Sequence, residues 1–289
     1  MPLLMNIAID ISTRLSRRVS YFEYKGIRFK LVQNDPRRHS DILLTLVDLN
    51  DTSAQERAYA AAAEWLSAVA WENGSYAAIR DTTSFGVRPF TALRQCRPRV
   101  LTHPEIHFGA GIRGQDILVI PNVETEEQRI ALALSREATS SNKVWLSILF
   151  YWQILEVAGT DAVAWVNRVY YRDQKVHVDE FQVKGLDLRG RRMGECFQEE
   201  GRHAIAHIRR KPGRRVLRFD EKPEIRRLNT TAHVLGKFAA HYIRTELRLA
   251  RRMHLVRRRG RGFPTYVDEE ALDHGRWTSA YRRRRPTTR

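Results

Sequence analysis

Residues 144–157 read VWLSILFYWQILEV and form the longest apolar stretch of the chain. Ser147, Gln153 and Glu156 are the polar residues that interrupt it. A membrane span needs about 20 consecutive apolar residues, so a stretch of this length predicts a buried helix, not a span. The residues on either side should therefore belong to a helical domain that surrounds this segment.

Helical patterns continue on both sides of this stretch. Thr125 precedes two acidic residues and can cap a helix that extends to about Ser140. Further helices are expected over about 142–157, after Thr160-Asp161, over about 194–207 and over about 228–248. Residues 172–192 between them contain KVHVDEFQVKG, which we interpret as a polar connection with a short hairpin. Because Pro121-Asn122 marks the change of character, we expect an all-α domain over residues 121–248.

The first 120 residues predict a module of mixed helix and strand. Residues 19–32 place aromatic and β-branched residues around Lys25-Gly26, which indicates a hairpin. Residues 41–49 form a second strand candidate, and short strands are expected at 76–80 and 115–120. Ser53 and Glu56 have the spacing of a capping box at the start of a helix that ends near Trp71. The fold class is therefore α+β, and this module shows no chemical motif.

The charge is unevenly distributed along the chain. The formal net charge is +17, and the last 42 residues carry +9 of it. Such an excess suggests a polyanionic partner. Residues 249–289 are Arg-rich and poor in apolar side chains, so we expect a basic tail that is largely disordered. Its run Arg282, Arg283, Arg284 and Arg285 is the candidate RNA contact, although a solvated terminus and GC-rich codon bias are alternative interpretations.

Compartment signals favour the cytoplasm. The two cysteines, Cys96 and Cys196, cannot build a disulfide framework and have no CxxC spacing. The first ten residues lack a basic n-region and include Asp10, so they do not read as a signal peptide. We therefore expect a cytoplasmic protein without a membrane contact.

One segment contains residues suited to chemistry. Residues 199–207 read EEGRHAIAH, in which Arg202 is followed five positions later by His207. An Arg-rich chain produces this spacing by chance, so the neighbourhood matters. Glu156 lies on the apolar 144–157 helix, where a carboxylate is costly unless it meets a cation. Arg202 and Arg136 are the two candidate partners of Glu156.

These segments resemble a known superfamily. FYWQILE and GRHAIAH are similar to the signatures of the HEPN superfamily (higher eukaryotes and prokaryotes nucleotide-binding), and of its Apea-like or methylamine-utilisation MauJ-like branch. Such proteins show Arg, four to six residues, then His, with a polar residue directly after the Arg. Arg202, His203 and His207 occupy these positions, with His203 where Asn is commonest.

The resemblance implies a metal-independent endoribonuclease with a toxin or defence role that needs no cofactor. It implies that the RNA 2′-hydroxyl attacks the adjacent phosphate. An imidazole such as His207 can act as general acid or base, and a guanidinium such as Arg202 can stabilise the phosphorane. His203 and Glu156 would be supporting residues. The implied partners are RNA, a second copy of the chain and an antitoxin or other protein.

Arg202 and His207 lie about 140° apart around an ideal α-helix, so they converge on one phosphate only if the helix ends or distorts between them. The alternative is a site shared between the two subunits of a homodimer.

Other interpretations stay open at this stage. Arg202 can be a structural ion pair with Glu156 or Glu199, and His207 a helix C-terminal residue favoured by the dipole. In that case the domain is a catalytically silent binding module, including an accessory role in methylamine metabolism. The segments 103–107 and 203–207 have HxxxH spacing, but neither contains HExxH, and we predict no metal site. The aromatic residues of the 144–157 helix are expected to be core.

Overall fold

The computed structural model describes residues 2–12, 18–34, 40–48, 50–51, 53–86, 92–97, 119–186, 188–203, 221–258, 263–272 and 277–279. The chain divides into two compact units. Unit 1 comprises Met1–Val123 together with Ala250–Arg289, and unit 2 comprises Glu124–Leu249. The α+β fold class is confirmed, since unit 1 contains the strands and unit 2 consists of helices.

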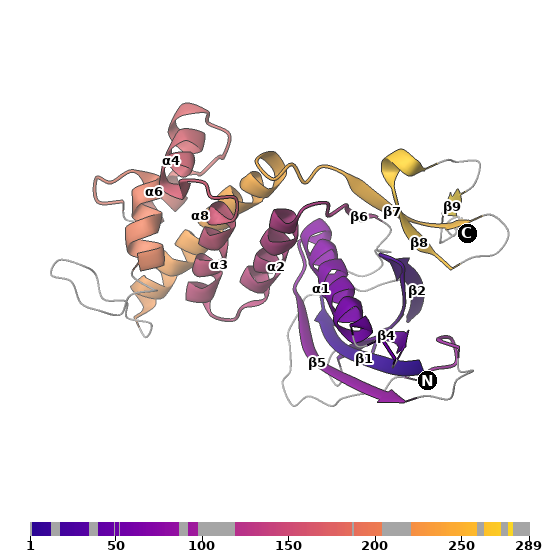
Figure 1. Ribbon diagram of the computed structural model, residues 1–289. Helices are drawn as coiled ribbons and strands as arrows, with labels where there is room; N and C mark the ends of the chain where they lie inside the picture. The colour runs from indigo at the N-terminus through magenta and orange to yellow at the C-terminus, as the bar shows by residue number, and fades with distance from the viewer. Residues whose placement is uncertain are drawn as a thin grey trace, which may run out of the picture. The chain divides into compact units, whose positions relative to one another are not determined.

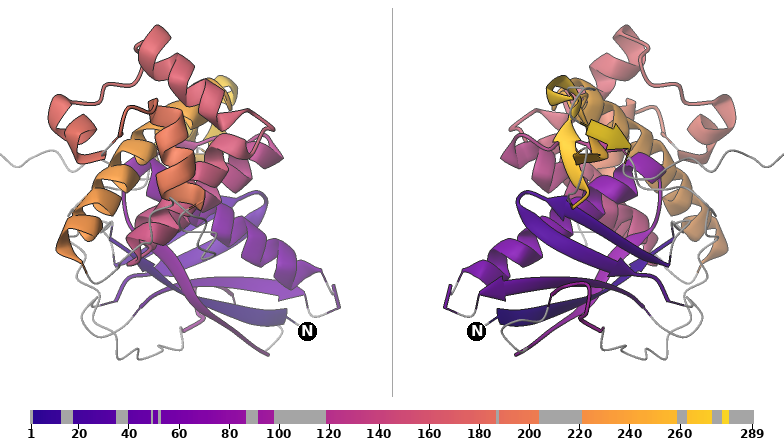
Figure 2. Two further views of the ribbon diagram at one scale, coloured as in Figure 1. Left: turned by 90° about the vertical axis from the view of Figure 1, so that its left-hand side faces the viewer. Right: turned by 90° about the vertical axis from the view of Figure 1, so that its right-hand side faces the viewer.

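Unit 1 is built on one sheet (Figures 1 and 2). Its strand order over the described residues is β5-β1-β4-β3-β2-β8-β7-β6, and β9 pairs with β7. The strands are β1 (Pro2–Ile11), β2 (Val19–Tyr24), β3 (Ile27–Val32), β4 (Asp41–Asp48), β5 (Ala77–Gly86), β6 (Val119–Pro121), β7 (Arg252–Arg258), β8 (Thr265–Asp268) and β9 (Trp277–Ser279).

The predicted hairpin and strands are present. β2 and β3 pair antiparallel, and Lys25 (φ 48°) and Gly26 (φ 74°) form the turn between them. Positive φ at both central residues gives a turn whose twist matches that of the strands, and Gly adopts it without steric cost. β4 confirms the strand expected over 41–49, and β5 begins within the 76–80 region. Of the segment 115–120, only Val119 and Ile120 lie among the described residues.

Helix α1 (Ala54–Asn73) covers one face of the sheet (Figures 1 and 2). The apolar side of α1 is buried, and Trp65 is 1% exposed and stacks on Phe22 of β2 with ring centroids 4.5 Å apart. The alternate residues of β1, from Leu3 to Ile11, join the same core. The residues between them contribute to a smaller cluster on the opposite face, where Leu93 and Cys96 cover the sheet.

The predicted capping box at α1 is wrong. Ser53 occupies the N-cap but makes no side-chain cap hydrogen bond. Its hydroxyl instead donates to Asp51 and accepts from Arg57. Asp51 and Arg57, which form an ion pair, therefore bind the Ser53 hydroxyl. In a capping box this hydroxyl would accept a hydrogen bond from a helix amide instead.

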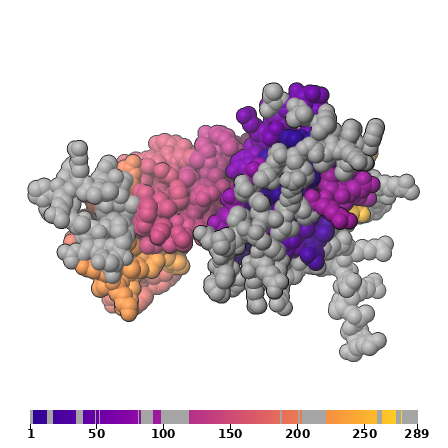
Figure 3. Space-filling model, turned by 90° about the horizontal axis from the view of Figure 1, so that it is seen from below, coloured from indigo at the N-terminus to yellow at the C-terminus, as the bar shows by residue number. Residues whose placement is uncertain are grey.

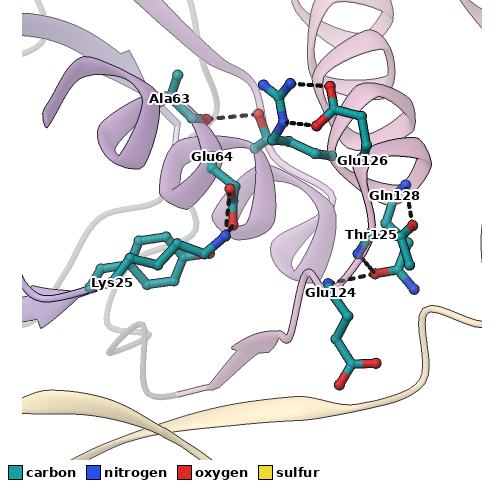
Figure 4. Close-up of polar contacts among 10 residues, drawn as sticks. Lys25, Ala63, Glu64, Glu124, Thr125, Glu126 and Gln128 are labelled. Carbon is teal, nitrogen blue, oxygen red and sulfur yellow. Dashed lines mark hydrogen bonds and ion pairs between the residues drawn. The ribbon is translucent and has the colours of Figure 1, made fainter. Parts of the chain in front are cut away.

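A buried carboxylate links α1 to the hairpin. Glu64 accepts hydrogen bonds from the Tyr24 hydroxyl at 2.6 Å and the Lys25 ammonium at 2.8 Å (Figure 4). Burial, followed by the charge of Glu64, raises the pKa of Tyr24 far above its usual range. Glu64 thus ties the turn to the helix through both of its oxygens.

The C-terminal segment differs from the expected disordered tail. β7 pairs with β6, β8 and β9, and Leu255 and Tyr266 are part of the core of unit 1. Arginines dominate the composition of this region, but the few apolar residues among them fall at positions that face the core. The segment therefore completes the sheet that the first 120 residues begin.

Unit 2 contains the expected helices, with two changes: π-helical turns interrupt the α-helices, and a helix replaces the expected hairpin. Its helices are α2 (Glu126–Ser140), α3 (Val144–Glu156), α4 (Ala162–Asn167), α5 (Glu180–Leu186), α6 (Met193–Cys196) and α8 (Lys222–Thr245), with π-helical turns at Arg168–Arg172 and Phe197–His203. Helix α8 lies against α3, as the orange and pink residues of Figure 3 show. The hairpin expected within 172–192 is wrong, because Asp179 and Gln182 cap helix α5 instead.

The start of α2 follows its sequence signal. Thr125 Oγ1 accepts from the Gln128 amide at 3.2 Å, and Gln128 Oε1 accepts from the Thr125 amide at 3.3 Å (Figure 4). The Gln128 side chain also donates to the Leu247 carbonyl at 2.8 Å. Capping thus attaches the first turn of unit 2 to its last residues. Within the described residues, no helix is both long and apolar enough to cross a membrane.

Candidate functional site at Arg202 and Glu156

Glu156 is held at the C-terminal end of α3. One turn before it, the indole Nε1–H of Trp152 donates to Glu156 Oε1 at 2.7 Å. Trp152 is 1% exposed, whereas the Glu156 side chain is 36% exposed. A buried indole N–H needs an acceptor, and this carboxylate supplies it. The hydrogen bond therefore fixes a solvent-accessible carboxylate on an otherwise apolar helix.

Arg202 is the cation that meets this carboxylate. Its Nε lies 3.7 Å from Glu156 Oε1, the same oxygen that accepts from Trp152. The other candidate, Arg136, contacts the neighbouring Glu137 at 2.7 Å. The Arg202 side chain is 38% exposed, and pairs in such a setting are worth about 0–1 kcal/mol. The pair thus keeps the guanidinium beside the carboxylate while water still reaches both groups.

Arg202 lies on a π-helical turn. Among the described residues of the helix expected over 194–207, α6 is α-helical, and Phe197–His203 forms hydrogen bonds of the i→i+5 kind. Phe197 anchors this turn, since it is fully buried and contacts Phe238 of α8 with centroids 5.9 Å apart. The 140° separation from His207 assumed α-helical winding, so it does not describe the segment that contains Arg202. Such turns are frequent at functional sites.

Several predicted site residues lie outside the described residues. His207 is one, and the run Arg282, Arg283, Arg284 and Arg285 is another. His203 is the last residue of the π-helical turn, and only its backbone is described. The HxxxH segment 103–107 is likewise outside. The structure thus brings Arg202 and Glu156 together, and the remaining assignments stay predictions.

In the part of the chain that is described, no group of three or more His, Cys, Asp or Glu side chains gathers at a spacing suited to a metal ion. Both cysteines are reduced and buried. Burial raises the pKa of Cys96, which disfavours its thiolate.

Two contacts were missed by the sequence reasoning. Trp152 was assigned to the core, which is correct, yet its indole also positions Glu156. A similar arrangement occurs at the end of α8, where Glu246 Oε1 accepts from the Trp165 indole at 2.8 Å and lies 3.3 Å from Arg168. The i, i+4 spacing of Trp152 and Glu156 could have indicated the first contact. The second joins residues 81 positions apart and has no local signal.

The helical unit is thus an α-helical bundle with an Arg–Glu–Trp site at its surface. Residues 131–244 match the family model described as "Methylamine utilization protein MauJ". This part of the chain, which contains α3, the π-helical turn and both Glu156 and Arg202, is MauJ-like, as its sequence resemblance indicated. No curated protein and no solved structure matches the chain.

Proposed function

We propose that the protein is a HEPN-type, metal-independent endoribonuclease that acts as a toxin or defence protein, with Arg202 and His207 as its catalytic residues. The RNA 2′-oxygen attacks the adjacent phosphorus, and the bond to the 5′-oxygen breaks. His207 takes the 2′-hydroxyl proton or protonates the leaving oxygen. Arg202 stabilises the charge of the phosphorane. The products are a 2′,3′-cyclic phosphate and a 5′-hydroxyl.

The observation that carries this proposal is the setting of Arg202. Its guanidinium is partly exposed, lies beside the carboxylate of Glu156, and extends from a π-helical turn. A guanidinium that water reaches can exchange this weak ion pair for a phosphate, which it binds through two parallel N–H groups. Glu156 and His203 serve as supporting residues in this scheme, and the Arg282–Arg285 run as an RNA contact.

Cleavage of single-stranded RNA in EDTA tests the proposal. Arg202→Ala and His207→Ala should each lower the rate by at least about 10²-fold. The matched control is Arg129→Ala, because Arg129 is also a partly exposed arginine of unit 2 that pairs with a glutamate. DNA should stay intact, since it lacks the 2′-hydroxyl. Full activity in Arg202→Ala would remove Arg202 from the mechanism.

We also propose that the active form is a homodimer, in which the Arg202–His207 segments of the two copies face one shared cleft. An equimolar mixture of inactive Arg202→Ala and His207→Ala chains then recovers activity if each site takes its Arg and His from different copies. No recovery in a mixture that forms heterodimers would reject the shared site.

The second candidate is a silent accessory or binding module. The match to a methylamine utilization family favours it, and the Arg202–Glu156 ion pair fits a purely structural role. Its partner would be a protein or a nucleotide. Absence of cleavage with intact folding, together with methylamine dehydrogenase genes beside this gene, would favour this module. Cleavage, or a neighbouring antitoxin gene, would favour the nuclease.

A further inference from the structure

The face of the sheet that is opposite α1 carries a group of aromatic and basic side chains. In the β2–β3 hairpin, Tyr21 pairs across the strands with Lys30, and Glu23 pairs with Arg28. Cross-strand partners lie on the same face of a sheet. These four side chains are therefore neighbours on the face that α1 does not cover.

Two other segments extend this group. Phe263 precedes β8, which pairs with β2 (Figure 1), and its ring lies edge-on to Tyr21 with centroids 6.0 Å apart. The guanidinium carbon of Arg28 is 5.6 Å from the Phe263 ring, and that of Arg94 is 5.9 Å from the Tyr21 ring. Three distant parts of unit 1 thus place two rings and two guanidinium groups together.

Lys30 fixes Arg94 in this position. Its ammonium donates to the carbonyls of Arg94 at 3.1 Å and Cys96 at 2.6 Å, and burial lowers its pKa. Lys30 thereby attaches residues 92–97 to the sheet, so Arg94 is presented from a held backbone. The buried ammonium itself is directed at these carbonyls, and the solvent-accessible cations of the group are Arg28 and Arg94.

The accessible groups are of the kind that a nucleic acid requires. The Arg28 side chain is 67% exposed, Arg94 is exposed, and Tyr21 and Phe263 are half-buried. Glu23 is the acid of the group; its side chain is 28% exposed and contacts Arg28 at 3.1 Å. The balance is therefore positive, and both rings and guanidinium planes can stack on bases.

We propose that this aromatic–arginine face, defined by Tyr21, Phe263, Arg28 and Arg94, binds single-stranded RNA. Bases stack on the two rings, and the two arginines contact the phosphates or stack in turn. The choice of RNA rests on the proposed function. Unit 1 then has a role that is separate from catalysis. It binds one part of the RNA, while another part of the same RNA is cleaved.

Fluorescence anisotropy with the full chain tests this assignment. The probe is a fluorescein-labelled oligouridylate of twelve 2′-O-methyl nucleotides, which cannot be cleaved by 2′-hydroxyl attack. Tyr21→Leu and Phe263→Leu should each raise the Kd about tenfold, within the range for loss of one stacked base. Arg94→Gln should lower the slope of log Kd against log salt by about 0.7 for one lost phosphate contact.

Matched controls exist within unit 1. Tyr59 is a tyrosine of α1 that is 41% exposed, and Arg57 is an exposed arginine paired with Asp51. Tyr59→Leu and Arg57→Gln should leave both the Kd and the salt slope close to wild type. If Tyr21→Leu and Phe263→Leu bind the probe with the same Kd as the controls, the proposal is overturned. A lowered melting temperature with an unchanged Kd would show that the two rings only stabilise the fold.

The two proposals fail separately. If the Arg202→Ala chain binds the probe with wild-type affinity and the added Tyr21→Leu change weakens that binding, the aromatic–arginine face is supported whether or not the protein cleaves RNA. Cleavage that is unaffected by Tyr21→Leu, together with unchanged probe affinity, would reject this face and retain the nuclease. Tighter binding of an oligothymidylate of the same length would overturn the assignment to RNA.

Discussion

Gly194 marks the closest approach between α6 and the backbone of α4. A Cβ placed on it would lie 2.5 Å from the carbonyl oxygen of Val163, and the Gly194 amide donates to the buried Asn167 Oδ1 at 2.9 Å. To reach an ordinary contact of about 3.4 Å, the two helices must separate by about 0.9 Å. Overpacking of this kind costs about 1–3 kcal/mol, and an unmade buried hydrogen bond costs about 1–3 kcal/mol more.

We therefore expect Gly194→Ala to lower the free energy of unfolding of unit 2 by about 2–6 kcal/mol. Urea unfolding of the full chain, followed by far-UV circular dichroism, measures this loss. The matched control is Gly236→Ala, because Gly236 is inside α8 and a Cβ there meets only the Tyr151 ring at 3.2 Å. Ala favours a helix interior by about 1 kcal/mol, so this variant should be neutral or more stable. Equal stability of the two variants would refute the close-packing argument.

Four further predictions concern the stability, the RNA affinity and the oligomeric state of the protein. Ending the chain after Arg248 should strongly lower the melting temperature of unit 1, since it removes the core residues Leu255 and Tyr266, worth about 1.5–3 kcal/mol each; an unchanged melting temperature in calorimetry would contradict the assignment of β7 and β8. Ending it after Ser279 removes five arginines, and it should flatten the salt dependence of RNA affinity with a smaller thermal effect. Burial lowers the pKa of His241 below its ordinary 6.5, although the charge of Glu246 opposes this shift. As the pH falls, the imidazole is therefore protonated at a higher pH in the unfolded chain than in the folded one. The free energy of unfolding should therefore decrease below about pH 6.5, and His241→Gln should weaken that dependence in titrations between pH 7.5 and 5. Light scattering should give about twice 33.7 kDa at micromolar concentration, and a monomer mass throughout would reject the homodimer.

Local chemistry explains which parts of the fold were predictable. Lys25-Gly26 and the Thr125 cap depend on neighbouring residues, and both are observed. Ser53 has the same kind of motif, but the nearby Asp51–Arg57 pair competes for its hydroxyl. β7 and β8 join the sheet through β6 and β2, which are more than 100 positions away, and arginine-rich composition hides their apolar residues.

The candidate site was also predictable only in part, because some of its contacts follow from local chemistry and others from long-range packing. The cost of a carboxylate on an apolar helix predicted a cation for Glu156, and Arg202 supplies it. The π-helical winding around Arg202 depends on how Phe197 packs against α8, which no local pattern encodes. The aromatic–arginine face is likewise assembled from β2, β3, residue 94 and residue 263, so no window of sequence contains it.

The pairing of β6 with β7 has a consequence for how the chain can be divided. Pro121 is opposite Arg252, and the Asn122 amide donates to the Arg251 carbonyl at 2.8 Å, directly where the chain leaves unit 1 and where it returns. Opposed strand residues are only about 4.5–5.5 Å apart. The helical unit is thus an insertion in what would otherwise be a hairpin, and a two-residue turn could replace it. The family match lies wholly inside this insertion, so we expect that the helical unit can be exchanged as a cassette while β6 and β7 stay paired.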